Sequence, residues 1–323
     1  MKKRLIAALA AATLVITSFA ACGSSSDSTT YKVGVIQLVQ HEALDAATEG
    51  FEDALKDKLG KNVEIEVQNA AGDSATCATI ANTFASQNVD LIMANATASL
   101  QAAVAATGTI PILGTSVTDY ATALEMTDWD GKTGINVSGT SDLAPLDQQA
   151  DMLEELFPAD SYGKVGILYC TAEPNSKYQA DNISKYLEEK GYTVSEYTFS
   201  DSNDIASVTQ TACDGSDVLY IPTDNTAASC TETISSVALA AAKPIVCGEA
   251  GICKGCGVAT LSIDYYQLGY KTGEMAYEVL VNGADPADME VETAETVTKQ
   301  YNKTICEQLG ITIPADYEAL EEE

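Results

Sequence analysis

An internal repeat constrains the fold of this chain more than any other feature of its sequence. Three segments of the first half have counterparts in the second: residues 32–36 (KVGVI) and 164–168 (KVGIL), 90–93 (DLIM) and 217–220 (DVLY), and 111–114 (PILG) and 244–247 (PIVC). Each pair is separated by about 130 residues, which is the length of a domain and not of a solenoid repeat. The sequence therefore predicts two structurally similar lobes.

Apolar strand patterns and helical patterns alternate within each copy. In the first copy we expect strands at 31–39, 64–69, 90–94 and 110–114, and helices at 41–59, 75–87 and 99–107. This alternation is typical of parallel sheets covered by helices on both faces. The predicted fold class is α/β, with two doubly wound lobes.

Extended segments between the two copies predict hinges. Residues 134–142 and 257–264 are the first two, and a third crossing is expected near 290–298. With three crossings, lobe I comprises residues 31–137 and 264–288, and lobe II comprises 138–263 and 289–323. Hinges of this kind absorb the closure of two lobes around a ligand.

The N-terminus predicts export. Lys2, Lys3 and Arg4 precede an apolar run that ends in small residues before Cys22. A charged start, an apolar middle and a small-residue cleavage site are typical of a secretory signal peptide. We expect a signal peptide at 1–21, a lipidated Cys22, and a small polar tether at 22–30. The mature protein would then lie on the extracellular face of the membrane, held by its lipid.

The charge and the motif content exclude several classes of function. The formal net charge of −30 repels nucleic acid and anionic headgroups, so we expect membrane contact through the lipid only. The chain has one histidine and lacks the GxSxG, HExxH and Gly-rich phosphate-loop motifs. We therefore expect a binding protein and not an enzyme, acting as a monomer without a cofactor.

Eight cysteines besides Cys22 leave their own pairing open. They are Cys77, Cys170, Cys213, Cys230, Cys247, Cys253, Cys256 and Cys306. An even number in an exported chain permits disulfides, whereas apolar surroundings favour free thiols. Cys253 and Cys256 form a CxxC, but no second pair and no nearby histidine complete a zinc site, so we expect no metal.

Short segments along the chain, taken in order, resemble one family. They are residues 40–46, 69–73, 117–119, 138–142, 173–176, 222–226, 264–269 and 309–314. Together they resemble the tryptophan/tyrosine-type substrate-binding proteins of ABC transporters. The resemblance implies a periplasmic-binding-protein-like fold of type I with three crossovers. It also implies capture of a small molecule for a transporter permease, and favours an aromatic amino acid. The many cysteines depart from the family pattern.

Polar residues after the predicted strands are the candidate ligand contacts, because ligands bind outside the carboxyl ends of strands in open α/β sheets. From lobe I these are Gln40, His41, Thr97, Ala98, Ser116 and Thr118, and from lobe II Glu173, Asn175, Asp224, Asn225 and Glu249. An amino acid suits this set. Its carboxylate would meet the helix N-terminus at Thr97 and Ala98, and its ammonium would meet Asp224.

Alternatives to these assignments stay open. Thr97 and Asp224 could be ordinary helix caps, and His41 could be a helix-start residue without a ligand role. The same fold could serve as a ligand-sensing lobe for a membrane receptor. A secreted enzyme with a Cys–His pair is the third alternative.

Overall fold

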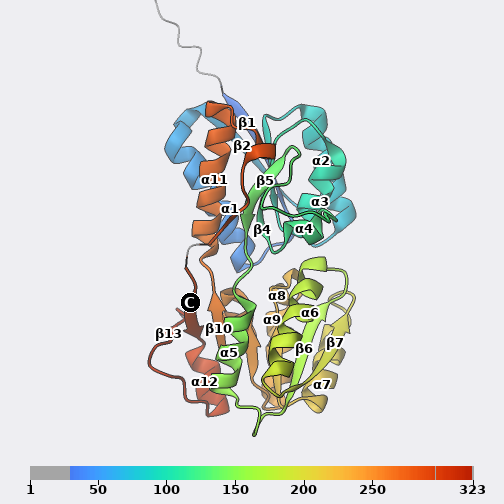
Figure 1. The fold of residues 1–323 in the computed structure, drawn as a ribbon, viewed down its shortest axis with the longest axis vertical. Helices are drawn as coiled ribbons and strands as arrows, with labels where there is room; N and C mark the ends of the chain where they lie inside the picture. The colour runs from blue at the N-terminus through green and yellow to red at the C-terminus, as the bar shows by residue number, and fades with distance from the viewer. Residues whose placement is uncertain (1–29, 295, 322–323) are drawn as a thin grey trace, which may run out of the picture.

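The structure, a computed structural model, describes residues 30–294 and 296–321. Two lobes lie end to end along the long axis of the molecule, and each is a sheet covered by helices on both faces (Figure 1). The C-terminal end of the chain lies beside the second lobe. This architecture confirms the predicted α/β class with two doubly wound lobes.

The sheet of the first lobe is entirely parallel. Its strands in spatial order are β11 (Glu292–Thr293), β5 (Val137–Ser141), β4 (Ile112–Val117), β3 (Leu91–Asn95), β1 (Tyr31–Gln37) and β2 (Val63–Asn69). Strand β1 shows why the sheet is covered twice. Val33 and Val35 pack with Phe51 on one face, and Ile36 packs with Phe84 on the other. A parallel sheet buried on both faces has such continuous apolar strands.

Helices α1 (Glu42–Leu59) and α11 (Tyr265–Asn282) cover one face of the first sheet, and α2 (Ser74–Gln87) and α3 (Thr97–Ala106) cover the other. Glycines let α1 and α11 approach closely. A Cβ at Gly269 would lie 1.9 Å from the carbonyl oxygen of Ala47, and one at Gly50 would lie 2.1 Å from that of Tyr266. Helix α11 is thereby fixed on the first lobe.

The sheet of the second lobe repeats the design, but its last two strands run opposite to the others. Its order is β13 (Glu318–Ala319), β12 (Thr298–Tyr301), β10 (Ala259–Ser262), β9 (Ile245–Cys247), β8 (Val218–Ile221), β6 (Lys164–Cys170) and β7 (Thr193–Phe199), with β12 antiparallel to β10. The helices around it are α5 (Leu146–Leu156), α6 (Pro174–Glu189), α7 (Ile205–Gly215), α8 (Asn225–Ala228), α9 (Thr231–Ala240), α10 (Ala250–Cys256) and α12 (Lys303–Leu309).

The chain crosses between the lobes three times, but two crossings lie a few residues beyond the expected boundaries. Strand β5 pairs with β4, so residues 138–141 belong to the first sheet and not to lobe II. Strand β11 pairs with β5, so residues 289–293 also stay with the first lobe. The extended, glycine-containing segment that suggested a hinge is itself a strand of the first sheet, between β11 and β4. A strand and a linker are both extended, so the sequence pattern did not distinguish them.

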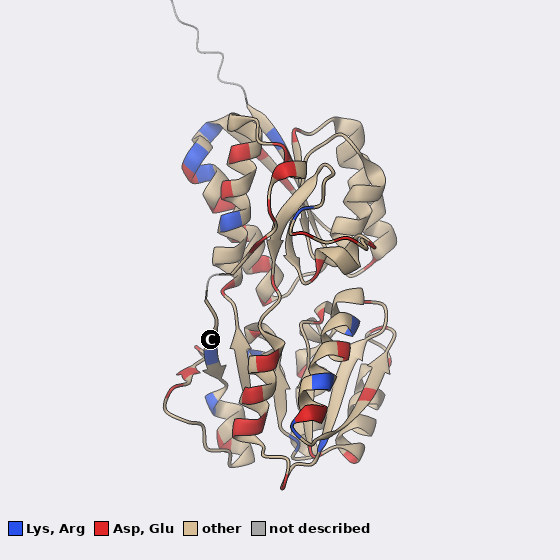
Figure 2. Cartoon of the chain, viewed as in Figure 1, with Lys and Arg blue, Asp and Glu red and all other residues tan. Residues whose placement is uncertain are grey.

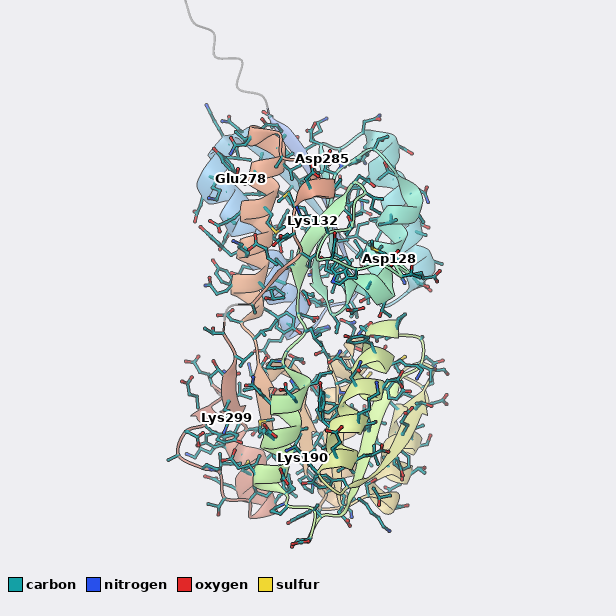
Figure 3. The ribbon with its side chains drawn as sticks, viewed as in Figure 1. Asp128, Lys132, Lys190, Glu278, Asp285 and Lys299 are labelled. Atoms are coloured by element: carbon teal, nitrogen blue, oxygen red, sulfur yellow. The ribbon has the colours of Figure 1, made fainter. Side chains whose placement is uncertain are left out.

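Acidic side chains cover both lobes with few basic ones between them (Figure 2). On the second lobe, Lys190 contacts Asp151 and Glu154 at 2.5 and 2.8 Å, and Lys299 contacts Glu155 at 2.8 Å (Figure 3). Exposed pairs of this kind stabilise a fold by at most about 1 kcal/mol each. Within residues 30–294 and 296–321, no helix has the length and apolar character needed to span a bilayer.

Candidate ligand-binding cleft

The carboxyl ends of the two sheets face each other across the gap between the lobes. A cavity of about 240 Å³ lies there, and it is lined from both sides, by Leu38, Gly72 and Ala98 of the first lobe and by Cys170, Glu173, Asn225 and Thr226 of the second, among others. The lobes also touch directly. His41 Nε2 lies 3.2 Å from Asn225 Oδ1, and Gln179 Nε2 lies 3.4 Å from Thr118 Oγ1.

The N-terminus of α3 opens on this cavity without a side-chain cap. The residue before the helix, Ala96, has φ 87°, a conformation that L-residues rarely adopt, and no side chain accepts a hydrogen bond from the first turn. Ala98 lines the cavity. An uncapped helix N-terminus offers free N–H groups and the positive end of the helix dipole. We predicted from the sequence that Thr97 and Ala98 would supply these N–H donors.

Ser116 lies beside that helix start. The backbone N–H of Ala96 donates to Thr115 O at 3.0 Å, which joins the end of β4 to the start of α3. Ser116 follows with φ 54° and is 6% exposed, and its Oγ has no hydrogen-bond partner. Strained backbone and unpaired buried hydroxyls are both costly, and such features cluster at ligand sites.

A buried carboxylate network connects the cleft to the first crossing. Asp142 accepts from Thr118 Oγ1 and from the Tyr265 hydroxyl, both at 2.9 Å. Burial raises the pKa of Asp142 above its usual range. Of these residues, only Thr118 was among the ligand contacts predicted from the sequence; Asp142, Tyr265 and Gln179 were not. Gln179 lies one helical turn after Asn175, so helical spacing could have revealed it.

The polar residues of the second lobe come together as expected, around Glu173. Its oxygens accept from Asn225 N and Nδ2 at 3.0 and 2.7 Å, from Thr226 N at 2.8 Å and from Asn175 Nδ2 at 3.3 Å. Asn175 also donates to Thr223 O at 3.1 Å. This arrangement fixes the orientation of the Asn225 amide, whose oxygen faces His41.

Asp224 lies behind this group. Its side chain is 1% exposed, and its two oxygens accept from Ala227 N at 2.8 Å and from Cys170 N at 2.7 Å. Burial, and then the charge of Glu173, raise the pKa of Asp224 above its usual range. This geometry is that of a helix cap, the alternative that the sequence left open. The ammonium role expected for Asp224 has no support in these contacts.

Glu249 and Gln40 lie apart from the group. Glu249 caps α10 through Gly251 N and Ile252 N, and burial raises its pKa to about 7. It lines a second cavity of about 600 Å³, between α1, α10 and the crossing at Tyr265. Gln40 is exposed and does not line the first cavity. The structure therefore does not bring these two predicted residues to the Glu173 group.

The eight cysteines of the described chain are all free thiols. Cys170 lines the cleft, where burial raises its pKa to about 11. Within residues 30–294 and 296–321, no group of three or more His, Cys, Asp or Glu side chains could hold a metal ion. Cys22 lies outside the described residues.

Fold and cleft together define a two-lobed binding protein whose ligand is enclosed between hinged sheets. Residues 32–321 match the family model described as ABC transporter substrate binding protein, so the chain belongs to that family. It is an ABC transporter substrate-binding protein, as the sequence resemblance predicted.

Two relatives of the chain are described together with the amino acid that they bind. The chain is 40% identical over 266 residues to a tyrosine-binding protein of Clostridioides difficile, covering 81% of this chain and 76% of the relative. It is 34% identical to an ABC domain from Streptococcus pneumoniae solved in complex with L-Trp, covering 89% and 97% of the two chains, with a TM-score of 0.84.

A third relative bears on the conformation. A ligand-free, open substrate-binding protein from Clostridium difficile is 37% identical, and 91% of this chain and 100% of that chain are covered, yet the TM-score is only 0.69. Sequence similarity is no lower than for the L-Trp complex, and a lower score at equal similarity agrees with a different orientation of the lobes in the open protein. With contacts such as His41 to Asn225, the structure is that of a closed molecule.

Proposed function

We propose that this chain captures an amino acid, and preferentially an aromatic one, in the cleft between its lobes. It then presents the ligand to the permease of an ABC importer. Two relatives support this ligand class, one a tyrosine-binding protein and the other solved with L-Trp. The relatives are solute-binding proteins, and we propose that this chain likewise acts by binding alone.

The observation that carries the proposal is the anion site at the start of α3. Uncapped N–H groups at Thr97 and Ala98 lie beside the unpartnered hydroxyl of Ser116. A ligand carboxylate would accept hydrogen bonds from all of them and would be favoured by the helix dipole. Such a group satisfies donors that otherwise stay buried and unpaired in the closed state.

Calorimetry with L-tyrosine, L-tryptophan and a sugar tests this proposal. We expect the amino acids to bind and the sugar not to bind. Ser116→Ala should weaken amino acid binding about 10- to 100-fold, because a hydrogen bond to a charged group is lost. Ser138→Ala is the matched control, since Ser138 is a buried serine whose Oγ contacts the carbonyls of Met289 and Glu290 outside the cleft. Amino acid binding that is indifferent to Ser116 would reject the anion site.

We also propose that the protein is a monomer held at the extracellular face of the membrane by a lipid on Cys22. The charged start, the apolar run and the small residues before Cys22 support this location. Mass spectrometry of native protein should find an N-terminus at Cys22 that carries acyl chains. An unmodified N-terminus upstream of Cys22 would contradict the anchor.

A further inference from the structure

His41 carries a buried nitrogen that no group of the described chain satisfies. It is the residue before α1, and its Nε2 reaches across the cleft to Asn225 Oδ1 at 3.2 Å. Its Nδ1 is buried and has no hydrogen-bond partner. Leu38 and Val39, just before it, and Asn225, opposite it, line the cavity of about 240 Å³.

The hydrogen bonds around His41 determine which nitrogen carries the proton. Asn225 Nδ2 donates to the Glu173 carboxylate at 2.7 Å, so the amide oxygen of Asn225 is the atom that faces His41. An amide oxygen only accepts, so Nε2 must be the protonated nitrogen. In a neutral imidazole the other nitrogen is then a bare acceptor, and Nδ1 holds that lone pair.

The imidazole is neutral in this environment. Burial lowers the pKa of His41 below its usual value, outweighing the hydrogen bond that His41 donates to Asn225 and the nearby charges of Glu173, Asp45 and Glu42. A buried acceptor without a donor is energetically costly. The closed state therefore gains stability when a ligand supplies an O–H or N–H group at this position.

The sheet order places this acceptor away from the anion site. Ser116 is the residue before the last in β4, helix α3 follows β3, and His41 follows β1, so the Ser116 end of the anion site lies two strands from His41 and the α3 end lies one. For a carboxylate bound at the Ser116 end, two strand spacings are roughly 10 Å, which is about the length of an aromatic amino acid. The α-ammonium of a ligand lies next to its own carboxylate, so the group that reaches His41 belongs to the far end of the ligand.

We propose that His41 selects ligands whose side chain ends in a hydrogen-bond donor, such as a phenol O–H or an indole N–H. The Glu173–Asn225 pair holds His41 in the accepting tautomer. This inference rests on the proposed function, because the ligand must lie with its carboxylate at α3. A site built to accept from a hydroxyl rejects the analogue without it, since the acceptor is then left unpaired.

Two variants separate the two ring nitrogens. Glutamine places its amide nitrogen where Nε2 was, so His41→Gln keeps a donor for Asn225 and removes the Nδ1 acceptor. Asparagine places its oxygen where Nδ1 was, so His41→Asn keeps the acceptor and removes the contact with Asn225. Calorimetry would compare L-tyrosine with L-phenylalanine, and L-tryptophan with 1-methyl-L-tryptophan. Thermal melts without ligand check that both variants fold.

We expect the wild type to bind the donor-bearing member of at least one pair about 100-fold more tightly. His41→Gln should reduce this preference to about threefold or less, whereas His41→Asn should weaken both members and retain the preference. Binding of all four ligands without discrimination would overturn the role of His41 and leave the proposed function standing. The same holds if His41→Gln preserves the preference. Failure of every aromatic amino acid to bind the wild type would instead reject the proposed ligand class, and this inference with it.

Discussion

Two kinds of polar side chain occur at the cleft, and their contacts distinguish them. Glu173 and Asp224 accept backbone N–H groups on every oxygen, so they organise the second lobe. Ser116 Oγ and His41 Nδ1 are buried without a partner. Native structures leave few buried polar atoms unpaired, and such atoms call for an explanation. At this site the explanation is a ligand that supplies an acceptor to Ser116 and a donor to His41.

Asp224→Asn tests whether Asp224 is a cap or a ligand contact. We expect the affinity for an amino acid to change by about threefold or less, because asparagine caps a helix about as well as aspartate. Loss of a charge paired with a buried ammonium would instead cost about 2–5 kcal/mol. Calorimetry with L-tyrosine separates the two outcomes. A loss of 30-fold or more, by roughly 1.4 kcal/mol per decade, would restore the ammonium role.

The stability of the same variant should depend on pH in a defined direction. Burial holds the folded-state pKa of Asp224 above the usual carboxyl range, so the folded chain binds this proton more tightly than the unfolded chain. Ionisation therefore destabilises the fold as pH rises through the raised pKa. Asparagine cannot ionise, so the melting temperature of Asp224→Asn should gain on the wild type between about pH 4 and about pH 7, the range between the carboxyl pKa of the unfolded chain and the raised pKa of the folded chain. A constant difference would contradict the raised pKa.

Sequence patterns predicted which residues end strands at the cleft but not what each one contacts. Strand-end position placed Glu173, Asn175 and Asn225 in one group and Ala98 at the cavity. The same rule included Glu249, which the structure places beside a second cavity. Periodicity indicates roughly where a strand ends, whereas the direction of a side chain near that end depends on the local backbone dihedrals. The φ of 54° at Ser116 is such a dihedral, and no sequence pattern announces it.

At the scale of elements, the predicted alternation of strands and helices agrees with the structure, and the ends differ by a few residues. Strand β4 was expected to end at Gly114 but continues to Val117, so Ser116 lies within the strand and not after it. A register shift between Gly114 and Val117 accommodates this extension beside β5. Thr115 and Ser116 are polar, so the apolar pattern stops before the strand does.

The predicted hinge boundaries were wrong for a similar reason, because polar residues and a glycine occur inside a buried strand. Strand β5 is fully buried although it contains Ser138, Gly139 and Thr140. At Gly139, φ is 143° and a Cβ would lie 2.0 Å from the carbonyl oxygen of Gly114, so glycine there permits strand packing. We took Gly139 in an extended segment as a sign of a flexible crossing. In the structure this glycine instead allows two strands to approach closely. The actual first crossing begins at Asp142, where the buried network with Thr118 and Tyr265 starts.

At the scale of the whole molecule, the proposed function depends on closure of the two lobes around the ligand. Only a ligand that binds the closed state better than the open state can shift the equilibrium between them. The anion site at α3 belongs to the first lobe, and the Glu173–Asn225 pair that orients His41 belongs to the second. The ligand contacts α3, Ser116 and His41 of the first lobe, and Asn225 of the second lobe holds His41 in its accepting tautomer only when the lobes are closed. The higher TM-score to the L-Trp complex than to the open relative agrees with this picture.

Small-angle scattering with and without L-tyrosine tests directly whether the two lobes close around the ligand. We expect the ligand-free protein to scatter as a more extended molecule. Saturating L-tyrosine should shift the scattering curve to the one calculated from the closed structure. His41→Gln and Ser116→Ala should need higher L-tyrosine concentrations for the same shift. Calorimetric binding of L-tyrosine with scattering curves that are the same in its presence and absence would contradict closure of the lobes around the ligand.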